Sequence, residues 1–308
     1  MNGRPRVSIG LPVFNGERFV AEAIDSILAQ TFEDFELIIS DNASTDGTEE
    51  ICRRYAEKDE RIRFVRNREN YGAAFNFNQT FHLSRGEFFK WAAHDDVLCP
   101  EFLERCVGVL DWEQTVAIAY TRMVAIDENG NRLPRGYAPW VVSSPRPYPR
   151  FRAAMRMAGR GSGPVWGLIR AGVLGQTGLQ PGYPHGDHVL LAELSLYGRF
   201  HEVPEELLLH RWHPGRYVLI SSQRSMTEWW IRSSSKRLPG PLGLLRMQLA
   251  PVARRGMGYV SSISRAPIHP GDRALCLVEL VWWSCQKLWV RGMRRLGDGR
   301  SAARADGT

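Results

Sequence analysis

The sequence predicts an α/β fold in which a mostly parallel, Rossmann-like sheet is flanked by helices. Three observations predict it. Strand-like and helix-like segments alternate over the first 125 residues, polar residues follow each of these strands, and 44% of the 308 residues are apolar. A chain of this length and composition can bury a sizeable core.

The first elements are marked by a change in the spacing of apolar residues. Residues 6–13 alternate larger apolar with small side chains, which predicts a strand, and residues 17–30 then carry apolar side chains at helical spacing. Residues 35–40 form a second expected strand that ends in Asp41. The turn-forming residues of 42–47 follow and lead into a second helix.

The alternation continues to about residue 110. Residues 62–66 predict a third strand, 73–84 a third helix and 87–92 a fourth strand, which ends at His94-Asp95-Asp96. Pro100 then stands where the next helix would begin.

Polar residues gather at one edge of this predicted sheet. Pro12, Asp41, residues 66–70 and residues 94–96 each follow a strand. Ligands of parallel sheets bind beyond the carboxyl ends of the strands. The sequence therefore predicts a ligand site on this rim.

The remainder of the chain has a less regular pattern. The expected elements are a strand at 116–126, a proline-rich loop at 134–149, a helix at 150–158, a strand at 165–169, a helix at 188–197 and a last strand at 205–212. We expect a catalytic domain over 1–216, with halves at 1–125 and 126–216. A helical, basic and Trp-rich extension then covers 217–308.

Charge and cysteine content narrow the choice of partners and compartment. The net charge of +7 is compatible with a solvated basic surface or with binding of phosphorylated ligands or anionic lipids. Nucleic-acid binding is disfavoured, because the basic residues form no clustered motif for reading nucleic acid. Five cysteines without a C-x-x-C pair indicate a reducing, cytoplasmic setting. The N-terminus has no apolar signal segment, and residues 275–290 contain Glu279 and Lys287, so we expect no membrane span.

The His94-Asp95-Asp96 tripeptide is the sharpest chemical feature. Two adjacent carboxylates repel each other, and a divalent cation held together with substrate phosphates removes that cost. A solvated acidic loop, or compensation of the following helix dipole, explains the same residues without a ligand.

Asp41 and Asp46 occupy one loop but invite different interpretations. Asp46 with Glu49 resembles a capping box for the second helix. Asp41 precedes that helix by several residues, so a contact to a ribose or a base edge explains it better.

Asp187 and His213 are ambiguous by themselves. Asp187 precedes a helix and reads as an N-cap, and a lone histidine such as His213 is most often a polar surface residue.

Four pieces of the chain together resemble the family 2 glycosyltransferases of GT-A fold, over about residues 6–216. They are residues 7–17 (VSIGLPVFNGE), 40–48 (SDNASTDGT), 70–76 (NYGAAFN) and 91–98 (WAAHDDVL) with Pro100 and Leu103. The order and spacing of the four are highly specific, although each alone is weak.

The resemblance implies roles on the donor side. Pro12, Phe14 and Glu17 would line the base and ribose pocket, and Asp41 would contact the base. The loop of Asn70 and Gly72, which continues to Asn76, would close over a UDP-, GDP- or dTDP-linked sugar.

His94-Asp95-Asp96 takes the place of the family's D-x-D signature. Many members have an aspartate where this chain has Ala93, so the resemblance leaves the metal ligand undecided between two residues. We assign Asp96 to Mg²⁺ or Mn²⁺, and Asp95 with His94 to the ribose or sugar.

The resemblance also implies the acceptor side and the late motif. Asp187 would be the catalytic base of an inverting transfer. Arg211-x-His213 would close over the diphosphate, with His213 toward the metal. Arg211-Trp212 follows Leu208, where processive synthases carry glutamine, which favours transfer of a single sugar.

Other functions fit less well. The first strand is followed neither by the Gly-rich phosphate loop of a nucleotidyltransferase nor by the G-x-G-x-x-G of a dehydrogenase. A non-catalytic nucleotide-sugar-binding protein of the same fold remains open.

Acceptor and location follow from the same resemblance and from the tail. A glycan, a glycolipid or a cell-envelope polysaccharide precursor is the expected acceptor. The apolar and basic residues of 270–296 predict a helix that lies on the inner face of a membrane, packs on the catalytic domain or forms a homodimer interface.

Overall fold

The computed structural model describes residues 4–157, 163–214 and 241–286. Its first half alternates strands and helices as β1 (Val7–Val13), α1 (Val20–Leu28), β2 (Phe35–Asp41), α2 (Thr48–Lys58), β3 (Ile62–Arg66), α3 (Ala73–His82) and β4 (Phe88–Trp91). These are the elements expected from the sequence, with ends that differ by up to three residues.

The second half is less regular. It contains β5 (Val97–Leu98), α4 (Phe102–Trp112), β6 (Val116–Ile126), α5 (Pro147–Met157), the 3₁₀ turn η1 (Gly163–Trp166), β7 (Leu168–Arg170), α6 (Ala171–Leu174), α7 (Gly186–Tyr197), β8 (Arg199–Arg211) and α10 (Pro241–Arg265). A further helix covers residues 270–286.

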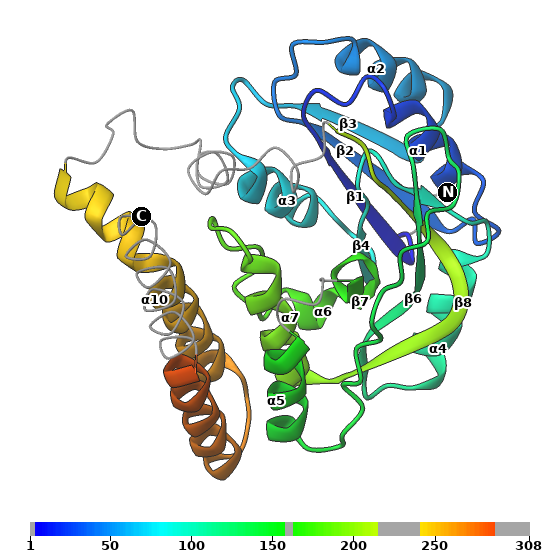
Figure 1. Ribbon diagram of the computed structural model, residues 1–308. Helices are drawn as coiled ribbons and strands as arrows, with labels where there is room; N and C mark the ends of the chain where they lie inside the picture. The colour runs from blue at the N-terminus through cyan, green and yellow to red at the C-terminus, as the bar shows by residue number, and fades with distance from the viewer. Residues whose placement is uncertain (1–3, 158–162, 215–240, 287–308) are drawn as a thin grey trace, which may run out of the picture.

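The strands form one sheet in the order β3-β2-β1-β4-β7-β6-β8-β5 (Figure 1). The pairs β1/β2, β2/β3, β1/β4 and β6/β8 are parallel, whereas the short β5 and β7 run antiparallel to their neighbours. The carboxyl ends of β1, β2, β3, β4, β6 and β8 therefore share one rim, which brings the predicted polar loops together.

Helices pack on the sheet through two apolar clusters. One joins α1, α2 and α4 to β1 and β2, and the other joins α5 and α7 to β6 and the C-terminal helices. Gly10 in β1 allows α3 to approach closely, because a Cβ there would lie 2.3 Å from Thr80 Oγ1. The strand β1 is buried along its whole length, as expected for the middle of a parallel sheet.

The described part of the C-terminal extension packs on the catalytic domain. Tyr259 of α10 is fully buried, and its ring lies 5.5 Å from Trp283 of the 270–286 helix and 6.2 Å from Phe151 of α5 (Figure 1). The expected domain boundary at 216/217 lies outside the described residues. No described helix is long and apolar enough to cross a membrane.

Two expected elements have different bounds. The strand expected at 205–212 begins at Arg199, because residues 199–203 also pair with β6. Pro204 and Glu205 are skipped in that register, and a proline that cannot donate to the ladder hides the first half of the strand from sequence patterns. The strand expected at 165–169 begins later, at Leu168, because Val165 and Trp166 belong to the η1 turn, and it ends at Arg170.

Candidate functional site

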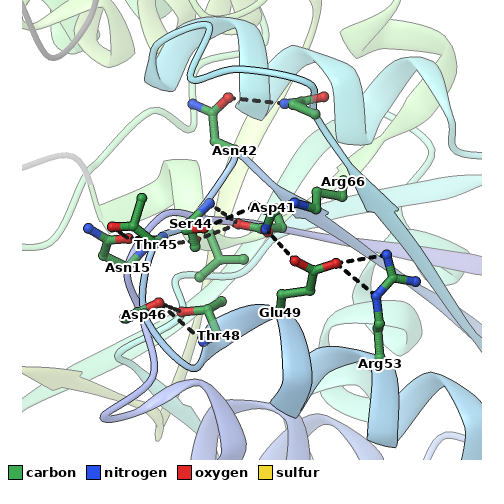
Figure 2. A network of polar contacts seen from close by, with 12 residues as sticks. Asn15, Asp41, Asn42, Ser44, Thr45, Asp46, Thr48, Glu49, Arg53 and Arg66 are labelled. Atoms are coloured by element: carbon green, nitrogen blue, oxygen red, sulfur yellow. Dashed lines mark hydrogen bonds and ion pairs between the residues drawn. The ribbon is translucent and has the colours of Figure 1, made fainter.

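The loops after β1 and β2 are held together by side-chain hydrogen bonds (Figure 2). The Asn15 backbone N–H donates to Ser44 Oγ at 2.9 Å, and Asn15 Oδ1 accepts from the Thr45 N–H at 2.9 Å. The Gly16 N–H donates to Thr48 Oγ1 at 2.8 Å. Asparagine tolerates the left-handed backbone at residue 15, where φ is 53°. The two loops therefore form a single preformed edge.

The residues expected to line the base and ribose pocket lie along this edge. Pro12 is buried in β1 opposite Ser40 of β2, and Phe14 is half-buried just beyond the strand. Glu17 is exposed, and its Oε2 accepts from the Gly47 N–H at 2.7 Å. The Glu17 carboxylate thus caps the start of α2, where a negative charge is favourable.

Asp46 and Glu49 only partly fulfil the expected capping box. Asp46 Oδ1 accepts from the Thr48 N–H at 3.1 Å and from the Thr48 hydroxyl. These bonds lower the pKa of Asp46 against the opposing effect of burial, which is the largest single contribution. Glu49 does not reach back to the cap, because it pairs with Arg66 and Arg53 instead (Figure 2).

Asp41 is completely buried and both of its oxygens are engaged. Oδ1 accepts from the Ser44 N–H at 2.9 Å, and Oδ2 is paired with Arg66 (Figure 2). The Arg66 side chain remains 30% exposed and also pairs with Glu49 at 2.9 Å. The exposed end of this charge network is therefore Arg66, a residue that the sequence reading passed over.

Asn42 organises the loop that carries Asn70 and Gly72. Its Nδ2 donates to Asn70 Oδ1 at 2.9 Å, and its Oδ1 accepts from the Tyr71 N–H at 3.0 Å. Asn70 Oδ1 in turn accepts from the Gly72 N–H at 2.9 Å. Gly72 has φ of 85°, which glycine adopts without strain. Asn42 looked like an ordinary turn former in the sequence, yet it fixes the shape of this loop.

Asn76 has a different role from the one expected. Its Oδ1 accepts from Ser40 Oγ at 2.6 Å and from Asn67 Nδ2 at 3.2 Å, and its Nδ2 donates to the Ser40 carbonyl at 2.8 Å and the Val13 carbonyl at 3.4 Å. The side chain is buried, and its amide has no further hydrogen-bonding capacity. Asn76 therefore joins the ends of β1 and β2 and is not available to a ligand.

The two adjacent aspartates have different partners. Asp96 is buried, where Oδ2 lies 3.0 Å from His210 Nδ1 and Oδ1 accepts from the Arg211 N–H at 2.9 Å. Both oxygens hold the end of β8. The assignment of Asp96 to the metal stays a prediction, in which the cation would share the carboxylate with these two contacts.

Asp95 instead lies beside His213. Asp95 Oδ2 is 3.1 Å from His213 Nε2, and the two side chains are 14% and 11% exposed. The Phe19 ring packs against the imidazole with centroids 4.9 Å apart. A carboxylate oxygen and an imidazole nitrogen at this separation suit neighbouring ligands of one divalent cation. Among the described residues no third His, Cys, Asp or Glu completes a cluster.

His94 is half-buried against the first loop of the chain. A Cβ on Gly16 would lie 2.6 Å from His94 Cδ2, so only glycine fits beneath this ring. His94 thereby links the D-x-D-like loop to the edge formed by residues 14–17.

Arg211 is a buried positioning residue. Its guanidinium pairs with Glu22 of α1 at 2.7 Å, donates from Nε to the Asp95 carbonyl at 2.9 Å and stacks on Phe19 at 4.8 Å. The side chain is 2% exposed. The arginine fixes the backbone between Asp95 and His213, and its expected contact with the diphosphate stays a prediction.

Asp187 lies in the first turn of α7. The helix begins at Gly186 and is preceded by His185 in the left-handed conformation, so Asp187 is not the N-cap. Its Oδ1 accepts from the His188 N–H at 2.9 Å, and the side chain is 24% exposed. The carboxylate thus remains accessible at the end of a buried helix.

The helix α7 is anchored from both sides. Glu193 accepts from Arg265 Nε at 2.8 Å and from the Gly178 N–H at 3.1 Å, which ties α10 to the loop before α7. Gln180 and Asn78 exchange two hydrogen bonds of 2.9 and 3.0 Å and so attach the same loop to α3. The first turn of α7 is therefore fixed relative to the helix that follows Gly72.

A cavity of about 460 Å³ lies between β6, β8 and residues 132–140. Of its lining residues, Trp140 is stacked 6.4 Å from His188, the neighbour of Asp187 in the chain. Tyr137, also in the lining, accepts at its Oη from the Trp212 indole N–H at 3.1 Å, and Trp212 precedes His213. Single ring contacts therefore connect the lining to the neighbours of Asp187 and of His213 in the chain.

Comparison with known sequences supports one family. The family model described as "Glycosyl transferase family 2" matches residues 8–168. EpsE of Bacillus subtilis, which is named as a glycosyltransferase, is 34% identical over 161 residues, covering 51% of this chain and 58% of EpsE. Chondroitin synthase of Escherichia coli is 32% identical over 140 residues, covering 46% of this chain and 20% of the synthase. The chain matches only part of the length of these relatives.

Solved structures are similar over more of the chain. S. aureus TarS, in complex with UDP-GlcNAc, superposes with a TM-score of 0.62 at 15% identity, covering 90% of this chain and 71% of TarS. The mannosyltransferase PcManGT from Pyrobaculum calidifontis, with GDP-Man and Mn²⁺, gives 0.52 at 18% identity and covers 94% and 88%. At these identities the likeness shows the GT-A fold with C-terminal helices and nothing more.

Proposed function

Because the chain belongs to glycosyl transferase family 2, we propose that it transfers a single sugar from a nucleotide-sugar donor to an acceptor hydroxyl with inversion. The observation that carries this proposal is the Asp95–His213 pair at the rim, together with the partly exposed carboxylate of Asp187 in the first turn of α7. An inverting transfer needs one group at the leaving diphosphate and another at the attacking hydroxyl.

The donor is proposed to be a UDP-, GDP- or dTDP-linked sugar. TarS and PcManGT are described with UDP-GlcNAc and GDP-Man, which makes a nucleotide sugar the natural class. The base and ribose would lie against Pro12, Phe14 and Glu17, with Asp41 acting through its partner Arg66. The loop of Asn70 and Gly72 would cover the nucleotide, with His94 near the sugar.

A divalent cation, Mg²⁺ or Mn²⁺, fits the donor set of Asp95 and His213. Two protein ligands leave several positions for diphosphate oxygens and water, as is usual for cations that bind nucleotides. When bound, the cation stabilises the negative charge that grows on the leaving nucleoside diphosphate. Arg211 holds the Asp95 carbonyl, and Asp96 holds the end of β8, so both keep the pair in register.

Asp187 is proposed to be the general base. Its carboxylate would accept the proton of the acceptor hydroxyl while the hydroxyl oxygen bonds to the anomeric carbon of the sugar. The bond from that carbon to the diphosphate breaks on the opposite face, which inverts the configuration. The anchored position of α7 supports this role, because proton transfer requires a base fixed within hydrogen-bond reach.

The acceptor is proposed to be a glycan, a glycolipid or a cell-envelope precursor, reached at the cytoplasmic face of a membrane. On the 270–286 helix Val278, Val281 and Trp282 are 65%, 63% and 47% exposed, and the Arg156 guanidinium lies 5.9 Å from the Trp282 ring. Apolar side chains beside arginine suit an anionic bilayer surface. The rest of the expected contact, residues 287–296, lies outside the described residues.

Co-sedimentation with liposomes tests this membrane contact. We expect wild-type protein to sediment with vesicles containing phosphatidylglycerol, and Val281→Lys/Trp282→Lys protein to remain in solution. Equal binding by both proteins would contradict the contact. A monomer–dimer difference between them would assign the face to a homodimer instead.

A thermal-shift screen tests the donor proposal. Nucleoside diphosphates and their sugars are added with Mn²⁺, and we expect at least one nucleotide family to raise Tm in a concentration-dependent way. A chain that responds to none of them would not be a nucleotide-sugar enzyme. The second candidate, a non-catalytic nucleotide-sugar-binding protein, would respond in this screen but release no nucleoside diphosphate.

A further inference from the structure

The charges that line the cavity beneath residues 132–140 are unevenly matched. Arg122 pairs with Glu202 at 3.1 Å, and Arg132 pairs with Glu206 at 3.0 Å. The remaining charged group in the lining is Arg135. Among the described residues no carboxylate pairs with it, so the lining carries one uncompensated positive charge.

Arg135 is held by an aromatic ring instead of a carboxylate. Its guanidinium carbon lies 3.7 Å from the centroid of the Trp212 ring. A guanidinium stacked on an indole keeps its N–H groups in its own plane, where they are available to an oxyanion. The Trp212 indole is itself oriented by its bond to Tyr137 Oη at 3.1 Å. The stacking thus fixes the arginine without consuming its hydrogen-bond donors.

The position of Arg135 connects it to both parts of the proposed site. Arg135 stacks on Trp212, which precedes His213 in the chain. Trp140, which lines the same cavity, stacks 6.4 Å from His188, the neighbour of Asp187. A molecule that occupies this volume of about 460 Å³ would lie within reach of the arginine.

We infer that the cavity binds an acceptor that carries an anionic group, a phosphate ester or a carboxylate, with Arg135 as its ligand. This inference rests on the proposed transferase function and names the acceptor class. A bidentate arginine recognises both oxyanions, whereas a neutral sugar would leave the charge unused. The donor diphosphate is the other anion in the reaction, so the test must separate the two.

Binding titrations separate acceptor from donor. Glucose 6-phosphate, glucuronate and methyl glucoside are titrated into the full chain by calorimetry, with and without a saturating nucleoside diphosphate and Mn²⁺. The variants are Arg135→Gln, Arg135→Lys and the control Arg63→Gln, an exposed arginine of β3 outside the cavity. Because Arg135 is exposed, its replacement should not disturb folding.

We expect at least one anionic sugar to bind about tenfold more tightly than methyl glucoside, with the nucleotide present. Arg135→Gln should lose this preference and Arg135→Lys should keep part of it, while both variants and Arg63→Gln keep the nucleoside diphosphate Kd of the wild type. Preference for phosphate or for carboxylate identifies which oxyanion the acceptor carries.

Two results would overturn the inference. One is the absence of any preference for anionic sugars in a protein that binds the nucleotide. The other is an Arg135→Gln variant that weakens nucleotide binding alone, since the arginine would then serve the donor. A protein that binds no nucleoside diphosphate at all would instead refute the proposed function. The titrations without nucleotide then still show whether the cavity prefers anionic sugars, so the two failures can be told apart.

Discussion

The rim formed by the loops after β1, β2 and β3 differs in construction from the cavity beneath residues 132–140. On the rim Asp41, Asn42 and Asn76 direct their polar atoms toward other protein groups and leave mainly Arg66 at the surface. At the cavity, within the part of the chain that the structure describes, Arg135 is stacked on Trp212 without a carboxylate partner, and the Asp187 carboxylate accepts a hydrogen bond from its own turn.

The difference indicates where specificity resides. A rim whose polar groups are satisfied internally is preorganised, and it can present the same shape to any member of one ligand class. A cavity with an arginine that no carboxylate pairs can recognise its complement on the ligand, because the guanidinium donors are not used by the protein. We therefore expect the rim to serve the shared nucleotide and the cavity to select the acceptor.

The largest expected effect is on the transfer rate, from a substitution at Asp187. Asp187→Asn should lower the transfer rate about 10²–10⁴-fold, since the amide cannot take the hydroxyl proton. Donor affinity should stay within about twofold of the wild type because the side chain lies away from the rim. The rate and the donor Kd are measured together, with the exposed Asp111→Asn as control. A parallel loss of donor binding would remove Asp187 from the role of base.

The second effect separates the two aspartates at the rim. Asp95→Asn and His213→Ala should each reduce the Mn²⁺-dependent gain in donor affinity by about tenfold or more. Asp96→Asn should keep that gain and lose about 1–3 kcal/mol of stability, because the amide keeps one acceptor oxygen and can no longer accept from both His210 and the Arg211 N–H.

Calorimetry with Mn²⁺ and with EDTA, combined with denaturant unfolding, distinguishes these outcomes. If Asp96→Asn abolished the response to the cation at unchanged stability, the ligand would be Asp96 after all.

The third effect concerns a buried lysine in the central sheet, which carries both regions. Lys90 is fully buried in β4, where its ammonium donates to the Trp166 carbonyl and lies 4.3 Å from the Phe102 ring centroid. Burial lowers the pKa of Lys90 from 10.5 to about 8. The folded protein loses this proton near pH 8, whereas the unfolded chain keeps it to about pH 10.5, so stability should rise with pH between these values.

The Lys90→Met variant isolates this contribution. From pH 8 to pH 10 the free energy of unfolding of the wild type should rise by about 2 kcal/mol relative to that of the variant, which lacks the titrating group. The exposed Lys58→Met serves as control in urea unfolding at each pH. A difference between wild type and Lys90→Met that is constant over this range would mean that Lys90 stays charged in the folded protein.

The smallest expected effect tests whether the polar side chains of the rim are hydrogen-bonded to one another. Asn76→Ala should cost about 2 kcal/mol of stability, because Ser40 and Asn67 lose their partners in a buried site. Nucleotide affinity should fall less than stability. Thermal and urea unfolding beside the exposed Gln114→Ala provide the check, and a variant that weakens nucleotide binding at unchanged stability would return Asn76 to a direct contact.

Much of the fold and the location of the rim could be predicted from the sequence. Apolar spacing is local, so the elements from β1 to β4 were predicted to within one to three residues, and parallel strands necessarily bring Asp41 and residues 94–96 to one edge. The partners of Asp95 and Asp96 could not be predicted, because adjacent residues in an irregular loop have no periodicity that tells inside from outside. The contacts of Asp96 come from His210 and Arg211, more than a hundred residues away.

The partners of the site residues were equally hidden. Arg66 and Asn42 have their roles because they pair with residues of other loops. All hydrogen-bonding groups of the Asn76 amide are used in contacts that the spacing of residues in the sequence does not predict. The cavity depends on residues 132–140 crossing β6 and β8, a path without regular pattern. Local chemistry could thus be predicted, but the long-range contacts that assign each side chain its task could not.

The most direct test of the central claim is release of nucleoside diphosphate from the donor found by the thermal-shift screen. Release is measured with Mn²⁺, with and without a mixture of glycan and sugar-phosphate acceptors, in wild-type and Asp187→Asn protein. We predict that acceptors accelerate release in the wild type and that the variant loses this acceleration while still binding the donor. Tight donor binding without release by the wild type, whatever the acceptor, would contradict the account and leave a nucleotide-sugar-binding protein.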